Sequence, residues 1–143
     1  MSTKLGHFIN NADVADDHRP APVYNPATGA QTKQVAMASK TTVEDAIAAA
    51  EAAYPAWRDT PPAKRARIMF RFKQLLEEHA DEIAAAITDE HGKVLDDAMG
   101  EFGRGVEVVD YACGIPELLK GEYSRNVGPG IDSWSDVQPR GVV

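Results

Sequence analysis

The chain has 143 residues, of which 43% are hydrophobic and 26% are charged, and its formal net charge is −7. These values fit one globular unit, and the acidic balance with scattered Lys and Arg argues against a nucleic-acid partner. No apolar run approaches the roughly 18 residues that span a bilayer, and the first ten residues lack a signal-peptide pattern. We therefore expect a cytoplasmic protein without a membrane partner. The single cysteine, Cys113, excludes an internal disulfide and favours a reducing compartment.

Strands and turns are predicted for the first 40 residues. Short β-prone runs at residues 8–10 and 22–24 favour a small hairpin, and residues 31–38 form a third extended segment. Between them lies Asn25-Pro26-Ala27-Thr28-Gly29, in which the proline fixes its own φ and the glycine can adopt a positive φ. We interpret this motif as a surface turn that needs no ligand.

A first helix is predicted to begin at Thr41, because Thr41-Thr42-Val43-Glu44 fits the capping box. Pro55 should disturb this helix near its end, and Trp57 should pack at the corner that follows. Helical spacing predicts a buried stripe formed by Val43, Ile47, Ala50 and Tyr54.

A second helical region is predicted to start after Thr60, where Pro61 and Pro62 suit a first turn, and to end at Gly92. Residues 62–91 would make a long helix for a globular protein. The sequence therefore leaves two alternatives, one continuous helix or two helices with a break near residues 79–81. The predicted buried stripe is Ile68, Phe72, Leu75, Leu76, Ile83 and Ile87.

A further helix is predicted from about residue 94 to residue 120. Its apolar stripe is Leu95, Met99, Phe102, Val106, Val109 and Cys113. Gly100, Gly103 and Gly105 interrupt it, and each costs roughly 1 kcal/mol relative to alanine, so we expect close packing or room for a ligand there. Arg104 points away from the stripe, and could equally form an ion pair with Glu101, Glu107 or Asp97.

Several catalytic and metal-binding patterns lack support. Cys113 lies on the apolar stripe without a neighbouring His, Lys or helix N-terminus, which is typical of an inert core thiol. The histidines are too far apart for a metal pair at helical spacing, no Cys-x-x-Cys occurs, and no carboxylate pair stands out. Neither Gly128-Pro129-Gly130 nor Gly103-Arg104-Gly105 has the strand-before, helix-after context of a dinucleotide phosphate loop.

After residue 120 the chain becomes extended and polar. Gly128-Pro129-Gly130 predicts a turn, and residues 131–137 alternate in the manner of an exposed strand. This strand could pair within its own chain or with a neighbouring subunit. Residues 139–143, Pro-Arg-Gly-Val-Val, are typical of the entry to a buried strand.

Three motifs in a fixed order resemble the aldehyde dehydrogenases: Val23-Tyr24-Asn25-Pro26-Ala27-Thr28-Gly29, Glu90-His91-Gly92-Lys93, and Gln138-Pro139-Arg140-Gly141-Val142-Val143. The resemblance runs from about residue 8 to residue 143, and it implies the opening third of an α/β enzyme. It divides the chain into N-terminal strands and turns (1–40), a helical part (41–120), an extended arm (121–138) and the truncated first strand of a nucleotide-binding domain (139–143).

Glu101-Phe102-Gly103-Arg104-Gly105 is similar to the branch of this family that oxidises methylmalonate and malonate semialdehyde to an acyl-CoA, with NAD and coenzyme A and with loss of carbon dioxide. In that branch the arginine of Gly-Arg-Gly binds the substrate carboxylate, which makes Arg104 the candidate substrate-binding residue. The family's catalytic cysteine and cofactor contacts would lie beyond residue 143. No catalytic, cofactor-binding or metal residue is therefore assigned, and the segment alone is predicted to be inactive.

The resemblance also implies a homo-oligomer, a tetramer or a dimer, formed through the strand at residues 131–137, with Trp134 and Val137 at the contact. Two alternatives remain open. One is another aldehyde dehydrogenase, such as a hydrolytic succinate-semialdehyde dehydrogenase. The other is a stand-alone, non-enzymatic helical module for binding or assembly.

Overall fold

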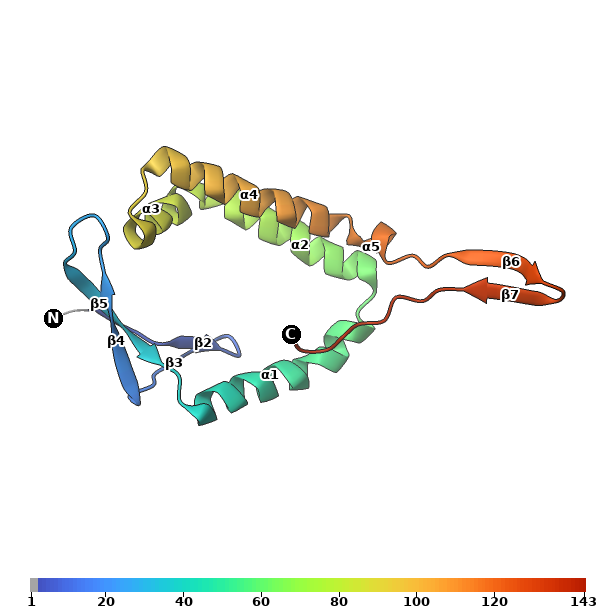
Figure 1. The fold of residues 1–143 in the computed structure, drawn as a ribbon, viewed down its shortest axis with the longest axis horizontal. Helices are drawn as coiled ribbons and strands as arrows, with labels where there is room; N and C mark the ends of the chain where they lie inside the picture. Colours follow the sequence, from blue (N-terminus) through green and yellow to red (C-terminus); the bar gives the residue numbers. More distant parts are fainter. Residues whose placement is uncertain (1–2) are drawn as a thin grey trace.

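The computed structural model describes residues 3–143, which form an open ring with a projecting arm (Figure 1). A small sheet closes one end of the ring, and helices form its two sides. The three-stranded sheet has the order β1-β5-β4, with β1 parallel to β5 and β4 antiparallel to it. Its strands are β1 (Thr3–Leu5), β4 (Arg19–Tyr24) and β5 (Gln31–Met37), and a separate hairpin joins β2 (His7–Ile9) to β3 (Ala12–Val14).

Two tight turns shape the strand region. Gly29 has a φ of 71°, and its N–H donates to the Asn25 carbonyl at 2.8 Å, which confirms the predicted turn between β4 and β5. The β2–β3 hairpin turns through Asn10 and Asn11, whose φ values are 50° and 63°. The predicted pairing of residues 8–10 with 22–24 was wrong, because β2 pairs with β3 and β4 with β5. Asparagine tolerates the left-handed conformation better than most residues, so the Asn-Asn pair is the local signal for the β2–β3 turn.

Five helices follow the sheet. The break between the second and third lies at His79, and Gly92, with a φ of 80°, ends the third as predicted. The helix predicted to reach residue 120 instead ends at Cys113, where Gly114 separates it from a single further turn. The helices are α1 (Lys40–Asp59), α2 (Pro62–Glu78), α3 (Ala80–His91), α4 (Leu95–Cys113) and α5 (Ile115–Leu118).

The predicted N-terminus of α1 was wrong. The N-cap is Ser39, whose Oγ accepts from the Thr42 N–H at 3.1 Å, so the capping box at Thr41 does not form. The helix starts earlier, with Ser39 as N-cap, and Asp16 accepts from the Ser39 N–H, the bond that a carboxylate at the third helical position makes in a capping box. At the other end the helix continues past Pro55 to Asp59, because Thr60 closes the last turn through bonds to the Trp57 and Ala56 carbonyls.

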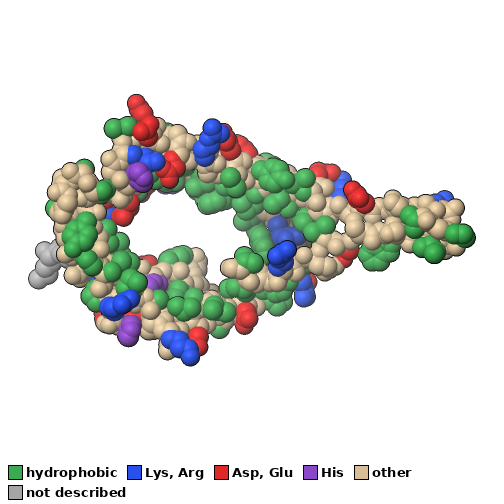
Figure 2. All heavy atoms as spheres, in the orientation of Figure 1, with side chains coloured by type: hydrophobic (Ala, Val, Ile, Leu, Met, Phe, Trp, Pro, Cys, Tyr) green, Lys and Arg blue, Asp and Glu red, His purple; other side chains and the backbone are tan. Residues whose placement is uncertain are grey.

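The core of the ring is small. The exposed surface is 10838 Å², whereas a folded monomer of 15.5 kDa is expected to expose about 7,200 Å². Figure 2 shows hydrophobic side chains along the helices where they border the central opening. Every fully buried apolar residue among residues 4–143 is small; these are Ala36, Ala66, Ala84, Ala98 and Cys113.

Only part of the predicted buried stripes is buried. On α4, against which α2 and α3 pack, Cys113 is buried and the stripe from Met99 to Val109 is half-buried, whereas Leu95 at its start is exposed. On α1, Val43 and Ile47 are each 47% exposed, and on α2, Ile68, Phe72 and Leu75 are also exposed. These predictions were wrong for this chain because α2 packs on α4 through its Ala66 side, and no described element covers the exposed faces of α1 and α2.

The arm is a two-stranded antiparallel hairpin of β6 (Tyr123–Gly128) and β7 (Ile131–Trp134) (Figure 1). Gly130, with a φ of 72°, forms part of the predicted turn. Pairing with β6 supports one of the two alternatives for the 131–137 strand, although both strands stay exposed along nearly their whole length. Among the helices of residues 3–143, none has the length and hydropathy required to cross a membrane.

Candidate functional site

Arg104 lies in the middle of α4 with its side chain 81% exposed. Its Nη1 donates to Glu107 Oε2 at 2.9 Å, which is one of the three ion pairs that helical spacing allowed. Glu101 instead accepts from Lys93 at the α3–α4 junction, and this contact lowers the pKa of the Glu101 carboxyl. The guanidinium of Arg104 therefore projects into solvent with only an exposed partner at its side.

The glycines around Arg104 leave the surface of α4 bare. A Cβ built on Gly100, Gly103 or Gly105 would meet no atom of residues 3–143 within 4 Å outside the helix's own backbone. Close packing inside this part of the chain therefore does not explain them. Two reasons for these glycines were expected from the sequence, close packing or room for a ligand, and the second remains. The glycines leave open space next to Arg104, where a ligand or another part of a longer polypeptide can approach the helix.

Two of the sequence motifs meet at the corner that leads into α4. Gly92 takes a φ of 80°, and a Cβ there would lie 2.7 Å from Cγ of Pro26, so the β4–β5 turn packs directly on the α3–α4 loop. Beside this contact, Lys33 Nζ donates to Asp89 Oδ2 at 2.6 Å and to Glu90 Oε1 at 2.9 Å. These carboxylates raise the pKa of Lys33 to about 12. The motif interpreted as a surface turn thus also anchors the sheet to α3.

A buried carboxylate joins the sheet to the other side of the ring. Asp16 Oδ1 accepts from the His18 N–H at 2.8 Å, and Oδ2 accepts from the Ser39 N–H at 2.9 Å and the Thr42 hydroxyl at 2.6 Å. These bonds, the Thr42 bond first, hold the pKa of Asp16 well below its usual range. The sequence analysis missed this residue. The first turn of α1 has no acidic residue of its own, although a negative charge is favourable at a helix N-terminus. That absence is the one local indication that a carboxylate from elsewhere lies there.

Cys113 is buried at the end of α4, as its place on the apolar stripe predicted. No group of three or more His, Cys, Asp or Glu side chains within residues 3–143 is arranged to hold a metal ion. Among these described residues, the candidate for function is Arg104, an accessible cation on a glycine-rich helix surface.

Comparison with known proteins identifies the class. Residues 14–143 match the model of the aldehyde dehydrogenase family, and the chain belongs to this family. It is 59% identical over 97% of its length to the malonate-semialdehyde dehydrogenase of Pseudomonas aeruginosa, and covers 28% of that protein. It is also 42% identical over 99% of its length to a probable methylmalonate-semialdehyde/malonate-semialdehyde dehydrogenase of Dictyostelium discoideum, of which it covers 26%.

Solved structures show that this chain has the corresponding part of the aldehyde dehydrogenase fold. The methylmalonate-semialdehyde dehydrogenase of Oceanimonas doudoroffii superimposes with a TM-score of 0.91 at 63% identity, over 97% of this chain and 28% of that one. A protein of Sinorhizobium meliloti 1021, assigned as a methylmalonate-semialdehyde dehydrogenase and solved with NAD, gives 0.92 at 44% identity, over 99% and 29%. The chain thus spans less than a third of the length of these relatives.

Proposed function

We propose that this chain is the N-terminal segment of an NAD-dependent, coenzyme A-acylating dehydrogenase that converts methylmalonate or malonate semialdehyde to an acyl-CoA with loss of carbon dioxide. The names of its relatives support the substrate class, and the family supports aldehyde oxidation. The structural observation that carries the proposal is the exposed Arg104 between glycines whose surface no described residue covers.

Arg104 would bind the carboxylate that distinguishes these semialdehydes from neutral aldehydes. A planar guanidinium can donate two parallel hydrogen bonds to the two oxygens of a carboxylate. Its pair with Glu107 is exposed, and such pairs contribute only about 0–1 kcal/mol, so a substrate carboxylate can replace it. The bare surface at Gly103 and Gly105 would give that carboxylate access to the guanidinium.

The rest of the chemistry would belong to the part of the enzyme outside these residues. NAD, when bound there, would take up the hydride from the substrate. Within residues 3–143, Gly128-Pro129-Gly130 forms the turn of a hairpin and Gly103-Arg104-Gly105 lies inside a helix, so neither is the strand-to-helix loop that holds a phosphate. We assign neither NAD nor coenzyme A to any residue here, and this segment would supply substrate recognition and framework.

The arm, residues 121–138, would carry contacts between subunits of a dimer or tetramer. An isolated two-stranded hairpin is marginally stable in water, yet this one exposes 71% of Trp134, and Val137 in the segment after it is 50% exposed. Covering these side chains in a neighbouring subunit would stabilise the hairpin. The same proposal includes the division of the chain into N-terminal strands, a helical part, the arm and the first strand of a nucleotide-binding domain. The cytoplasmic location remains a prediction from the sequence.

The test is Arg104→Gln in the full-length enzyme, assayed with malonate semialdehyde and with the neutral aldehyde propanal. Because a hydrogen bond between charged groups contributes about 1.5–3 kcal/mol, kcat/KM for the semialdehyde should fall at least about tenfold, and about a hundredfold if two bonds are lost. Propanal turnover should stay within about twofold of wild type, since it offers no carboxylate.

Arg67→Gln is the matched control, because Arg67 is an exposed helical arginine on α2. It should leave both substrates unaffected. An equal loss of turnover on both aldehydes in Arg104→Gln, or no loss on either, would contradict the role of Arg104. Analysis of the product separates the acylating enzyme, which forms an acyl-CoA, from a hydrolytic relative, which releases the free acid.

A further inference from the structure

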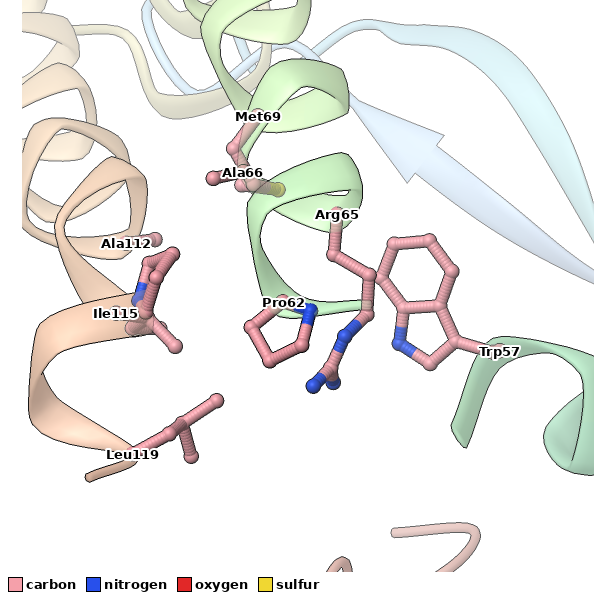
Figure 3. Close-up of a pocket in the computed structure, with 9 residues that line it drawn as sticks. Trp57, Pro62, Arg65, Ala66, Met69, Ala112, Ile115 and Leu119 are labelled. Carbon is pink, nitrogen blue, oxygen red and sulfur yellow. The ribbon is translucent and has the colours of Figure 1, made fainter. Parts of the chain in front are cut away.

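Within residues 3–143, the side chain of Arg104 is hydrogen-bonded to one group, the carboxylate of Glu107 one helical turn further along α4. The two atoms of this bond, Arg104 Nη1 and Glu107 Oε2, lie 2.9 Å apart. Arg65 on α2 is held differently, because its guanidinium carbon lies 5.9 Å from the centre of the Trp57 ring (Figure 3). Glu107 thus presents to Arg104 the same chemical group that a semialdehyde substrate would present, a carboxylate.

Three acidic residues share this region of α4 with Arg104, but only one of them pairs with it. Glu101 accepts from Lys93, and this contact lowers the pKa of the Glu101 carboxyl. Asp97, about two turns before Arg104, is exposed and makes no ion pair with it among the described residues. Because Lys93 holds Glu101 at the α3–α4 junction, Glu107 is the carboxylate that occupies the guanidinium.

The pair between Arg104 and Glu107 is weak enough to exchange with another carboxylate. Both side chains are mostly exposed, at 81% and 66%, and an exposed ion pair forms with an equilibrium constant of about 1 to 5. Glu107 uses one oxygen and one guanidinium nitrogen, whereas a free carboxylate can accept two parallel bonds. Two carboxylates on one guanidinium repel each other. Binding of a substrate carboxylate therefore competes with the bond to Glu107.

We propose that Glu107 is a positioning residue that competes with the substrate carboxylate for Arg104 and thereby sets the affinity of the enzyme for semialdehydes. This inference rests on the proposed function, because it requires Arg104 to bind the substrate carboxylate. Glu107 pairs with the guanidinium while the site is empty, and it takes the guanidinium back when the product has left. The competition lowers the affinity for the semialdehyde about two- to sixfold, as follows from the equilibrium constant of an exposed pair.

Glu107→Gln in the full-length enzyme tests this competition, because the amide keeps the size of the side chain and removes its charge. We expect kcat/KM for malonate semialdehyde to rise about two- to sixfold, through a lower KM at a kcat within about twofold of wild type. Turnover of propanal should not respond, since propanal has no carboxylate to compete with. A purely structural role for Glu107 would change both substrates alike.

Asp97→Asn is the matched control, because it removes an equal charge from the same helix without breaking a bond to Arg104. It should change kcat/KM for either substrate less than about 1.5-fold. A second comparison places Glu107→Gln in the Arg104→Gln background. There the glutamine at position 107 should have no effect, since the competition acts only through the guanidinium.

An unchanged or lower kcat/KM for the semialdehyde in Glu107→Gln would overturn the competition, as would an equal rise in Asp97→Asn or an effect that persists without Arg104. The single variant Arg104→Gln separates the two proposals. A selective loss on the semialdehyde in Arg104→Gln, with no response to Glu107→Gln, contradicts the competition alone. No selective loss in Arg104→Gln contradicts the substrate role of Arg104 and the competition together.

Discussion

Helices α1 and α4 are nearly equal in length, at 20 and 19 residues, but they are held in opposite ways. Helix α4 packs against α2 and α3 and buries Ala98 and Cys113. Helix α1 buries no residue. Asp16 and Ser39 fix its start, and Trp57 lies against Arg65 near its finish. An apolar stripe therefore specifies which face of a helix will be covered, without specifying what covers it.

The difference has an energetic meaning. Most helical stability in proteins comes from packing an apolar face, and full burial of a side chain such as Val or Ile contributes about 1.5–3 kcal/mol. Val43 and Ile47, each 47% exposed, receive only part of that stabilisation in this chain. We expect α1 to gain the remainder from polypeptide beyond residue 143, whereas α4 already has much of its packing.

Gly92→Ala should have the largest effect on the stability of the chain, because it disrupts the contact between the β4–β5 turn and the α3–α4 loop. The new Cβ would face Pro26 Cγ at 2.7 Å, and the φ of 80° is itself unfavourable for alanine. Together we expect a loss of about 2–4 kcal/mol in urea unfolding. Gly29→Ala is the control, since its φ is 71° but nothing lies within 4 Å. Equal losses in the two variants would show that the Pro26 contact is unimportant.

Asp16→Asn tests the polar attachment of α1. At pH 7 the variant should melt roughly 5 °C below wild type, because the amide cannot replace a carboxylate that accepts three bonds. Since the pKa of Asp16 is lowered from 3.8 in the folded chain, its stabilisation is complete above about pH 4 and is lost as the pH falls further. The difference in Tm should therefore shrink below pH 4.

Asp13→Asn, at an exposed position on β3, provides the comparison for this titration. It should shift the Tm little at any pH. If the difference between Asp16→Asn and wild type stayed constant down to pH 2, the carboxylate would not be the group that stabilises the junction.

Ile47→Ala should have the smallest effect in the short chain, below about 0.5 kcal/mol, because lost partial burial is offset by the higher helix propensity of alanine. In the full-length enzyme the same change should cost about 2–4 kcal/mol. Met99→Ala on α4 should instead be costly in both forms, since Met99 is already partly buried. Similar losses for Ile47→Ala in the two forms would remove the contrast between α1 and α4.

Features that depend on neighbouring residues could be predicted from the sequence. The positive φ at Gly29 and Gly92, the buried face of α4 and the pairing of Arg104 with a glutamate three residues away all follow from local geometry. Contacts between distant residues could not be predicted in the same way. Asp16 accepts from the Ser39 N–H at the start of a helix that begins 24 residues later, and no local pattern in the sequence indicates this bond.

In the candidate site, too, local features could be predicted from the sequence and contacts between distant residues could not. Arg104 was selected because Gly103-Arg104-Gly105 resembles a segment of the semialdehyde branch, and the structure shows open space beside these glycines. Arg65 carried no sequence signal, because its contact with the Trp57 ring joins two different helices. The exposed stripes of α1 and α2 were wrongly predicted as buried for the same reason, since helical periodicity contains no information about where the covering polypeptide begins.

The central claim is that this chain recognises the substrate while the chemistry resides in the remainder of the enzyme. The most direct test measures NADH and acyl-CoA formation from methylmalonate semialdehyde, side by side, for the full-length enzyme and for the purified 143-residue chain. The account predicts both products from the full-length enzyme and neither from the short chain. Reduction of NAD by the short chain alone would contradict it.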